Sequence, residues 1–344
     1  MEALLGAFGG KLAERWLSLL VLPGILFVGV VLAANTLGYD HALDVRFLGE
    51  RVHGWPAPGA RLRAGSLALL LGAVLLGAAA GGLAARAVGA GVARVVLAAD
   101  WREWPPPARQ IAAALTERRR QRWNGADARY LRERDLAVAA AVRRRATAAG
   151  PSPELPPDPA RSALSAARQR RERICAARPD RPSWTGDRFH ALAARLREQY
   201  ALDLAAVWPV LWLSLPDGAR AEVRSAHDAL DRGFVLAGWG VLYAATAVVW
   251  WPGLPLGLAV LLAARHRTRA AATAYVLLLE ATVVLHGPEL ARTLGVQPAA
   301  GPLDHDTGWR LTCIAQADPP VLRAAAPSLH EPAPGQPGPG PAAV

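Results

Sequence analysis

The sequence predicts an all-α integral membrane protein with four transmembrane helices and a helical cytoplasmic region. The AVILMFWYC set makes up 52% of the 344 residues and charged residues only 19%, below the roughly 25% of ordinary soluble chains. The apolar residues gather into long uncharged runs, and no stretch of the central region 101–232 sustains the alternation of apolar and polar residues that is typical of strands. The formal net charge of +11 is unevenly spread, which predicts an orientation for the spans.

The first predicted span covers residues 16–35, WLSLLVLPGILFVGVVLAAN, and follows a cytoplasmic N-terminus at residues 1–15. At ~1.5 Å per residue, this uncharged run covers the ~30 Å hydrocarbon layer. Pro23-Gly24 predicts a kink, which neighbouring helices can tolerate. A cleaved signal peptide is the alternative. The run exceeds the roughly 7–15 apolar residues of such a peptide, so a retained anchor is expected.

The second predicted span covers residues 64–86 and is rich in small residues. Gly77 and Gly81 form a GxxxG pattern, which lets helix backbones approach closely in lipid. These two glycines are the predicted helix-packing residues. The sequence stays compatible with a helix up to residue 100.

Residues 233–264 form a third uncharged region, which as one helix would measure ~48 Å, too long for one upright span. A helical hairpin with spans at 233–251 and 252–268 fits better. Trp250 and Trp251 then lie at the far membrane interface, beside a Pro-Gly pair that turns the chain.

The loop charges orient these spans. Residues 36–63 hold four Arg against three acidic residues, a net of +1, whereas residues 101–232 hold 25 Arg against 16 acidic residues, a net of +9. Positive loops face the cytoplasm, so 36–63 is predicted to be external, and both termini cytoplasmic, in a multi-pass protein of the cell membrane.

The cytoplasmic region 101–232 is arginine-rich and divided by a Pro-rich linker at 150–159. Segments 109–122, 128–148 and 161–178 consist of good helix formers. The Arg runs have three interpretations: solvated ion pairing within helices, contact with anionic lipid headgroups, or contact with nucleic acid. Nucleic acid is disfavoured because acidic residues interleave with the Arg runs. The candidates for lipid-headgroup contact are Arg118, Arg119, Arg120, Arg265, Arg267 and Arg269.

The stretch that begins RPSWTGDR predicts a helix capped by Thr185 or Asp187. It is followed by the short apolar run ALDLAAVWPVLWLSL, in which Trp208 and Trp212 lie one turn apart. A run this short is typical of a buried or interfacial helix, and we expect Trp208 and Trp212 at the membrane boundary.

Residues 269–325 are predicted to form a cytoplasmic helix and loop, and the Pro/Gly/Ala tail at 326–344 is predicted to be disordered. The apolar stretch 270–286 leaves a fifth span open, with Glu280 as an intramembrane carboxylate.

Motifs for catalysis and cofactors are absent from the sequence, including Walker A, GxSxG, HExxH and CxxC. Asp304-His305-Asp306 is the one tight group of hard ligands, and we interpret it as a polar turn rather than a metal site. The sequence therefore predicts a protein that is not an enzyme and has no metal or cofactor.

Several motifs together resemble a group of uncharacterised multi-spanning integral membrane proteins of high-GC actinobacteria. The resemblance covers residues 14 to about 295. It rests on ERWLSLLVLPG, on WREWPPPARQ with LTERRRQRWNGADARY, on RPSWTGDR with QYALDLAAVWPVLWLSLPD, and on WWPG. It implies membrane location and topology and carries no activity.

These features predict a non-enzymatic membrane anchor, scaffold or sensor. Its basic cytoplasmic helices would engage a protein partner or anionic membrane lipid. The alternative is a small transporter or channel, a homo-oligomer packed through the Gly77/Gly81 face.

Overall fold

A computed structural model describes residues 22–44, 46, 47, 49, 64–147, 159–175, 177–296 and 303–316. The regular structure of this described part is entirely helical, with no strand. The predicted N-terminus, the start of the first span, most of the external loop and of the Pro-rich linker, and the predicted disordered tail lie outside it.

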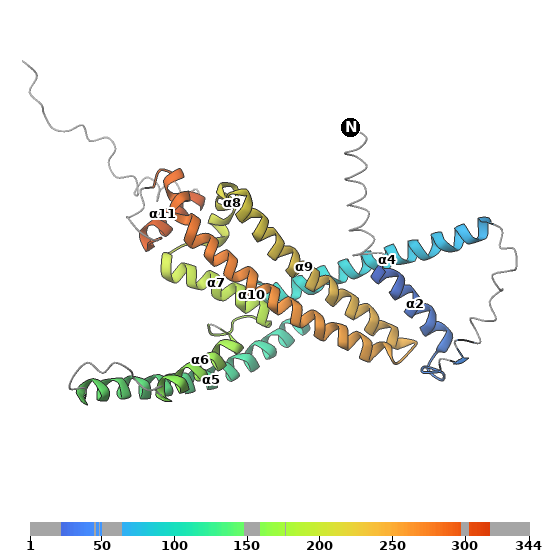
Figure 1. The fold of residues 1–344 in the computed structure, drawn as a ribbon, viewed down its shortest axis with the longest axis horizontal. Helices are drawn as coiled ribbons and strands as arrows, with labels where there is room; N and C mark the ends of the chain where they lie inside the picture. Colours follow the sequence, from blue (N-terminus) through green and yellow to red (C-terminus); the bar gives the residue numbers. More distant parts are fainter. Residues whose placement is uncertain are drawn as a thin grey trace, which may run out of the picture. The chain divides into compact units, whose positions relative to one another are not determined.

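The chain divides into two compact units, residues 1–191 with 223–276 and residues 192–222 with 277–344. The elements in chain order (Figure 1) are α2 Leu22–Leu37, α4 Ala64–Leu97, η2 Trp101–Glu103, α5 Pro106–Thr147, α6 Pro159–Ile174, α7 Trp184–Tyr200, α8 Leu204–Ser214, α9 Asp217–Ala245, η3 Thr246–Val248, α10 Gly253–Thr293 and α11 His305–Gln316.

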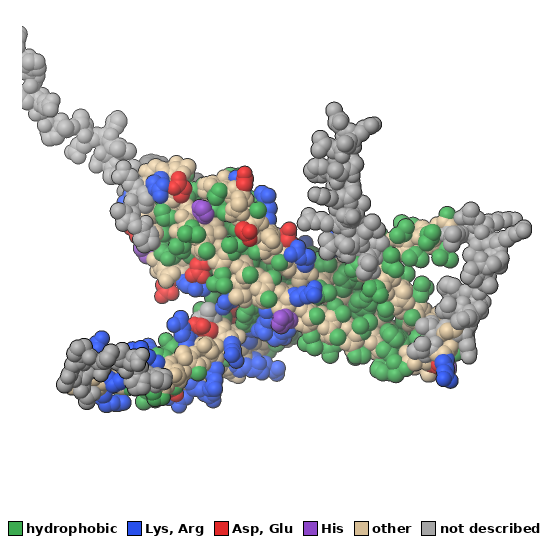
Figure 2. All heavy atoms as spheres, viewed as in Figure 1, with side chains coloured by type: hydrophobic (Ala, Val, Ile, Leu, Met, Phe, Trp, Pro, Cys, Tyr) green, Lys and Arg blue, Asp and Glu red, His purple; other side chains and the backbone are tan. Residues whose placement is uncertain are grey.

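Two described helices are long and apolar enough to cross a membrane, Ala68–Leu97 within α4 and Gly253–Thr293. Helix α4 leaves large apolar side chains exposed along its length, including Leu69 and Leu76. Figure 2 shows hydrophobic atoms covering the visible face of α2, α4 and the turn end of the α9–α10 hairpin, with few charges among them. An exposed apolar surface of this extent is typical of a face that contacts lipid or another protein.

In the described structure, the helices at the other two predicted spans are not both long enough and apolar enough to cross a membrane. The described apolar part of the first, Pro23–Leu37, is too short. Helix α9 begins at Asp217 and carries Asp228, Asp231 and Arg232 ahead of its apolar half. The number of membrane-capable helices in the described residues is therefore two, against the four predicted.

The α9–α10 hairpin differs in detail from the prediction. Helix α9 ends at Ala245, short of the predicted 251, because η3 and a turn at 249–252 complete the reversal. Trp250 Nε1 donates a hydrogen bond to the Ala42 carbonyl oxygen at 2.8 Å, and the Tyr39 hydroxyl donates to the Ala247 carbonyl oxygen. The turn is thus fixed to the segment that follows α2.

Helix α10 continues through 270–286 without a break. That stretch is therefore an extension of the preceding helix and not a separate fifth one. In the second unit, the Glu280 side chain pairs with Arg195 Nη1 at 3.1 Å. Helix α5 is likewise one continuous helix, where two segments, 109–122 and 128–148, were predicted.

The second unit contains a small pair formed by α8 and α11. Asp203 caps α8 by accepting a hydrogen bond from the Ala205 backbone N–H, and its own backbone N–H donates to Thr312 Oγ1 at 2.9 Å. A Cβ at Gly308 would lie only 1.9 Å from the Tyr200 carbonyl oxygen, so α11 approaches that backbone closely. Trp208 and Trp212 lie on α8 with ring centroids 5.8 Å apart.

Candidate anion-binding site

Asp187, on the first turn of α7, connects three parts of the first unit. Its carboxylate is 1% exposed and accepts hydrogen bonds from the backbone N–H groups of Asp180 and Arg181 at 2.9 and 2.8 Å. The second carboxylate oxygen accepts from Arg119 Nη2 of α5 at 2.7 Å. Both oxygens of the buried carboxylate therefore accept hydrogen bonds, as burial requires.

Asp180 forms a second connection between α5 and the loop that precedes α7. Its Oδ1 accepts hydrogen bonds from Arg102 Nη2 at 2.7 Å and from Arg120 Nη2 at 2.9 Å. Arg120 Nε donates to the Pro179 carbonyl oxygen, and Trp101 Nε1 donates to the Asp180 carbonyl oxygen. Side chains from η2 and α5 thus hold this loop in place.

Ser183 caps α7, and the predicted caps, Thr185 and Asp187, are wrong. Because the helix begins at Trp184, Ser183 occupies the capping position, where its Oγ accepts a hydrogen bond from the Gly186 backbone N–H at 2.8 Å. The same hydroxyl donates to the Val96 carbonyl oxygen at the end of α4. The start of α7 is therefore attached to the end of α4.

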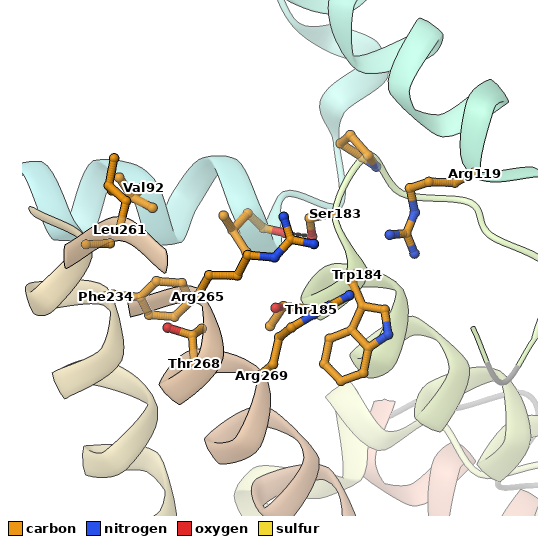
Figure 3. A pocket seen from close by; sticks show the side chains of 13 residues that line it. Val92, Arg119, Ser183, Trp184, Thr185, Phe234, Leu261, Arg265, Thr268 and Arg269 are labelled. Carbon is orange, nitrogen blue, oxygen red and sulfur yellow. Dashed lines mark hydrogen bonds between the residues drawn. The ribbon is translucent and has the colours of Figure 1, made fainter. Parts of the chain in front are cut away.

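A cavity of about 340 Å³ opens beside this attachment, within the first unit (Figure 3). Three arginines from two helices line it: Arg119 from α5, and Arg265 and Arg269 from α10. Hydroxyl groups of Ser183, Thr185 and Thr268, the Trp184 ring and apolar residues of α4, α9 and α10 complete the lining.

The three arginines differ in how their charge is balanced. Arg119 is neutralised by Asp187. Among the described residues, neither Arg265 nor Arg269 forms an ion pair with a carboxylate, and Arg269 lies over the Trp184 ring at 4.6 Å from its centroid. The positive end of the α7 dipole opens at the same place. Two guanidinium groups without a carboxylate partner, the hydroxyls of Thr185 and Thr268 and a helix N-terminus form an environment suited to an anion.

The structure distributes the predicted headgroup arginines among several environments. Arg119, Arg265 and Arg269 line one cavity. Arg120 pairs with Asp180, while Arg118 and Arg267 lie exposed outside the cavity. Sequence reasoning did not identify Asp180, Asp187 or Ser183 as partners, and the RPSWTGDR motif was the one signal that pointed to this loop.

The predicted helix-packing residues and two of the predicted interface residues, Trp250 and Trp251, lie elsewhere in the first unit. A Cβ at Gly77 would lie 3.3 Å from Val28 Cγ2, and one at Gly81 would lie 3.3 Å from Phe27 Cδ1, so α2 of the same chain covers this face. Trp250 donates its hydrogen bond to the Ala42 carbonyl oxygen, and Trp251 is exposed in the hairpin turn.

The Asp304-His305-Asp306 group, predicted as a polar turn, opens a helix instead. Asp304 accepts the Thr307 backbone N–H at 3.0 Å and so caps α11, which begins at His305. Hydrogen bonds from Thr307 lower the pKa of the Asp304 carboxyl below its ordinary value. Across the described residues, no three His, Cys, Asp or Glu side chains lie close enough to hold a metal ion.

Comparison with protein-family models, with curated proteins and with solved structures found no match to the chain. Function is therefore inferred from the geometry of the cavity and from the surfaces around it.

Proposed function

We propose that this chain is a non-enzymatic integral membrane anchor or sensor whose basic cytoplasmic region binds an anionic lipid headgroup. The observation that carries the proposal is the cavity lined by Arg265 and Arg269, two guanidinium groups without a carboxylate partner among the described residues. Guanidinium groups bind phosphate strongly because they donate paired, charge-assisted hydrogen bonds.

The position of these arginines along α10 supports a location at the headgroup layer. They follow directly on the uncharged stretch 253–264, and the matching stretch of α9 is 233–245. At ~1.5 Å per residue, each stretch reaches only about 20 Å, short of the ~30 Å hydrocarbon layer. A hairpin inserted to its full depth therefore places Arg265 at the membrane surface, where arginine side chains reach phosphates.

The charge distribution supports the cytoplasmic side. The cavity draws Arg119 from residues 101–232, the segment that carries a net charge of +9. Figure 2 shows Arg side chains gathered over α5 and α6, away from the hydrophobic face. Anionic lipids of the cytoplasmic leaflet attract such a basic surface.

The alternative, a transporter assembled through Gly77 and Gly81, is less well supported. In the described structure α2 occupies the face that these glycines form. Oligomers built on that face would have to displace a helix of the same chain.

The test compares lipid binding by the purified full chain and by two variants in detergent micelles that contain phosphatidylglycerol. Arg265→Gln with Arg269→Gln should weaken binding about tenfold, because two charge-assisted contacts are lost. Arg118→Gln with Arg267→Gln removes the same charge from exposed positions outside the cavity and should change binding less than about twofold. Equal losses of binding in both variants would show that binding depends only on the net charge, and this would overturn the proposal.

A further inference from the structure

A second cavity of about 610 Å³ lies where α4 and α5 meet. It is almost entirely apolar, and Ser183 is the one hydroxyl among its lining side chains. The residues that line it are Val95, Val96, Trp104, Pro105, Ala108, Ile111, Ala112, Leu115, Pro182 and Ser183. We call it the α4–α5 groove.

The groove exposes large apolar side chains. Val95 is 54% exposed, Ile111 64% and Leu115 45%. These residues project from α4 and α5 into a hollow, so an apolar ligand could cover them together. Covering exposed apolar surface of this kind is favourable because it removes that surface from water.

The α4–α5 groove and the arginine cavity share a wall. Val96, Pro182 and Ser183 line both. The hydrogen bond from Ser183 Oγ to the Val96 carbonyl oxygen fixes this wall, and Gly186 lets α7 approach it, since a Cβ there would lie 2.8 Å from the same oxygen. A cationic cavity and an apolar groove therefore adjoin across a few fixed residues.

We infer that the two cavities bind one anionic phospholipid, with its phosphate beside Arg265 and Arg269 and one acyl chain in the α4–α5 groove. This inference rests on the proposed function and adds the place of the acyl chain. Charge complementarity favours the phosphate beside the two arginines, and the apolar lining favours the acyl chain in the groove. The groove also begins on α4, one of the two helices that are long and apolar enough to cross a membrane, so a lipid could enter it from the bilayer.

The first experiment uses the full chain in detergent and two probes, long-chain phosphatidylglycerol and its water-soluble deacylated headgroup. Ile111→Gln with Leu115→Gln should weaken binding of the long-chain lipid about tenfold and leave headgroup binding unchanged. Leu136→Gln with Val138→Gln, at exposed positions of α5 outside the groove, is the matched control and should bind both probes as the wild type does.

The outcomes separate this inference from the proposed function. Wild-type lipid binding by the groove variant, with loss in the Arg265/Arg269 variant, would overturn the inference and leave the proposed function standing. Wild-type binding of both probes by the Arg265/Arg269 variant would overturn both. Equal loss of both probes in the groove variant would also count against the inference.

A second measurement does not depend on groove variants that could fail to fold. Trp104 lines the groove, so phosphatidylglycerol with brominated acyl chains should quench its fluorescence. The quenched component is obtained as the difference between the wild type and Trp104→Phe. Unchanged quenching in Trp104→Phe would overturn the inference. A protein segment found to cover Ile111 and Leu115 in lipid-free preparations would also overturn it, because the groove would then bind that segment.

Discussion

Two regions of the first unit join their helices by different means. In the apolar region, α4 and α9 meet through glycines: a Cβ at Gly238 would lie 2.0 Å from the Ala85 carbonyl oxygen, and one at Gly89 would lie 2.7 Å from the Phe234 carbonyl oxygen. In the basic region, α5 and α7 meet through Arg119 and Asp187, whose charged groups are 2.7 Å apart.

The basic region repeats this polar pattern between α5 and α6. Arg171 Nη1 pairs with Asp127 at 3.0 Å, and its guanidinium lies over the Tyr130 ring at 4.2 Å from the centroid. Trp123 Nε1 donates to the Cys175 carbonyl oxygen at 3.1 Å. Side chains thus carry the contact between these helices.

The difference follows from what each helix surface offers. A helix surrounded by apolar groups gains little by moving one apolar side chain from lipid to another helix, so close backbone approach between small residues supplies the contact. Helices rich in Arg and Ala have few large apolar side chains to bury, so directed hydrogen bonds supply it.

The largest effect is expected for Asp187→Ala. The change removes the partner of Arg119 and leaves two part-buried backbone N–H groups without their acceptor. We expect a loss of about 3 kcal/mol in the free energy of unfolding, followed by Trp fluorescence in detergent with added denaturant. Asp135→Ala removes an exposed partner of Arg134 on α5 and should cost less than about 1 kcal/mol. Comparable losses in the two variants would contradict the role given to burial.

A smaller effect, about 2 kcal/mol, is expected for Gly238→Ala, because the new methyl group meets the Ala85 backbone and separates α4 from α9. Gly91→Ala is the matched control, since a Cβ there meets nothing within 4 Å. That control should raise stability by up to about 1 kcal/mol, because alanine favours the helix. The midpoints of thermal unfolding in detergent report both changes, and the same sign for both would refute the close-approach argument.

The smallest effect concerns Asp304, a helix cap outside both regions. Its pKa is lowered by hydrogen bonds from Thr307, so the folded value lies below the ordinary 3.8. The stabilisation of α11 is therefore fully present above that ordinary value and is lost as the pH falls through the lower folded value. Hydrogen-exchange protection of 305–316 should decline over that acidic window in the wild type. In Asp304→Asn this decline should disappear, and its persistence would assign the effect to another group.

Local features made much of the helical organisation predictable. Uncharged runs and helix-forming segments predicted the helices, and Trp250-Trp251-Pro252-Gly253 marked the turn between α9 and α10. The boundaries were less predictable: α5 continues through Gly125, and α10 continues past Arg265, Arg267 and Arg269. Stable helices tolerate single weak positions, so neither a glycine nor a charge marks an end by itself.

The arginine cavity was predictable only in part. Arg119, Arg265 and Arg269 were candidates because they lie in basic clusters, but so were Arg118, Arg120 and Arg267. The choice among them depends on which side of α5 and α10 meets the loop before α7, and on which Arg has a carboxylate within reach.

The sequence by itself determined the all-helical class, the uneven charge and the apolar surface, because these follow from composition and from periodicity along the chain. Only the tertiary structure decided that Asp187 neutralises Arg119, that α2 covers Gly77 and Gly81, and that two cavities share Val96, Pro182 and Ser183. The physical reason is the distance along the chain over which each feature is determined. Helix formation depends on neighbours within a turn or two, whereas a binding cavity depends on side chains that are far apart in the chain and meet only when the helices pack.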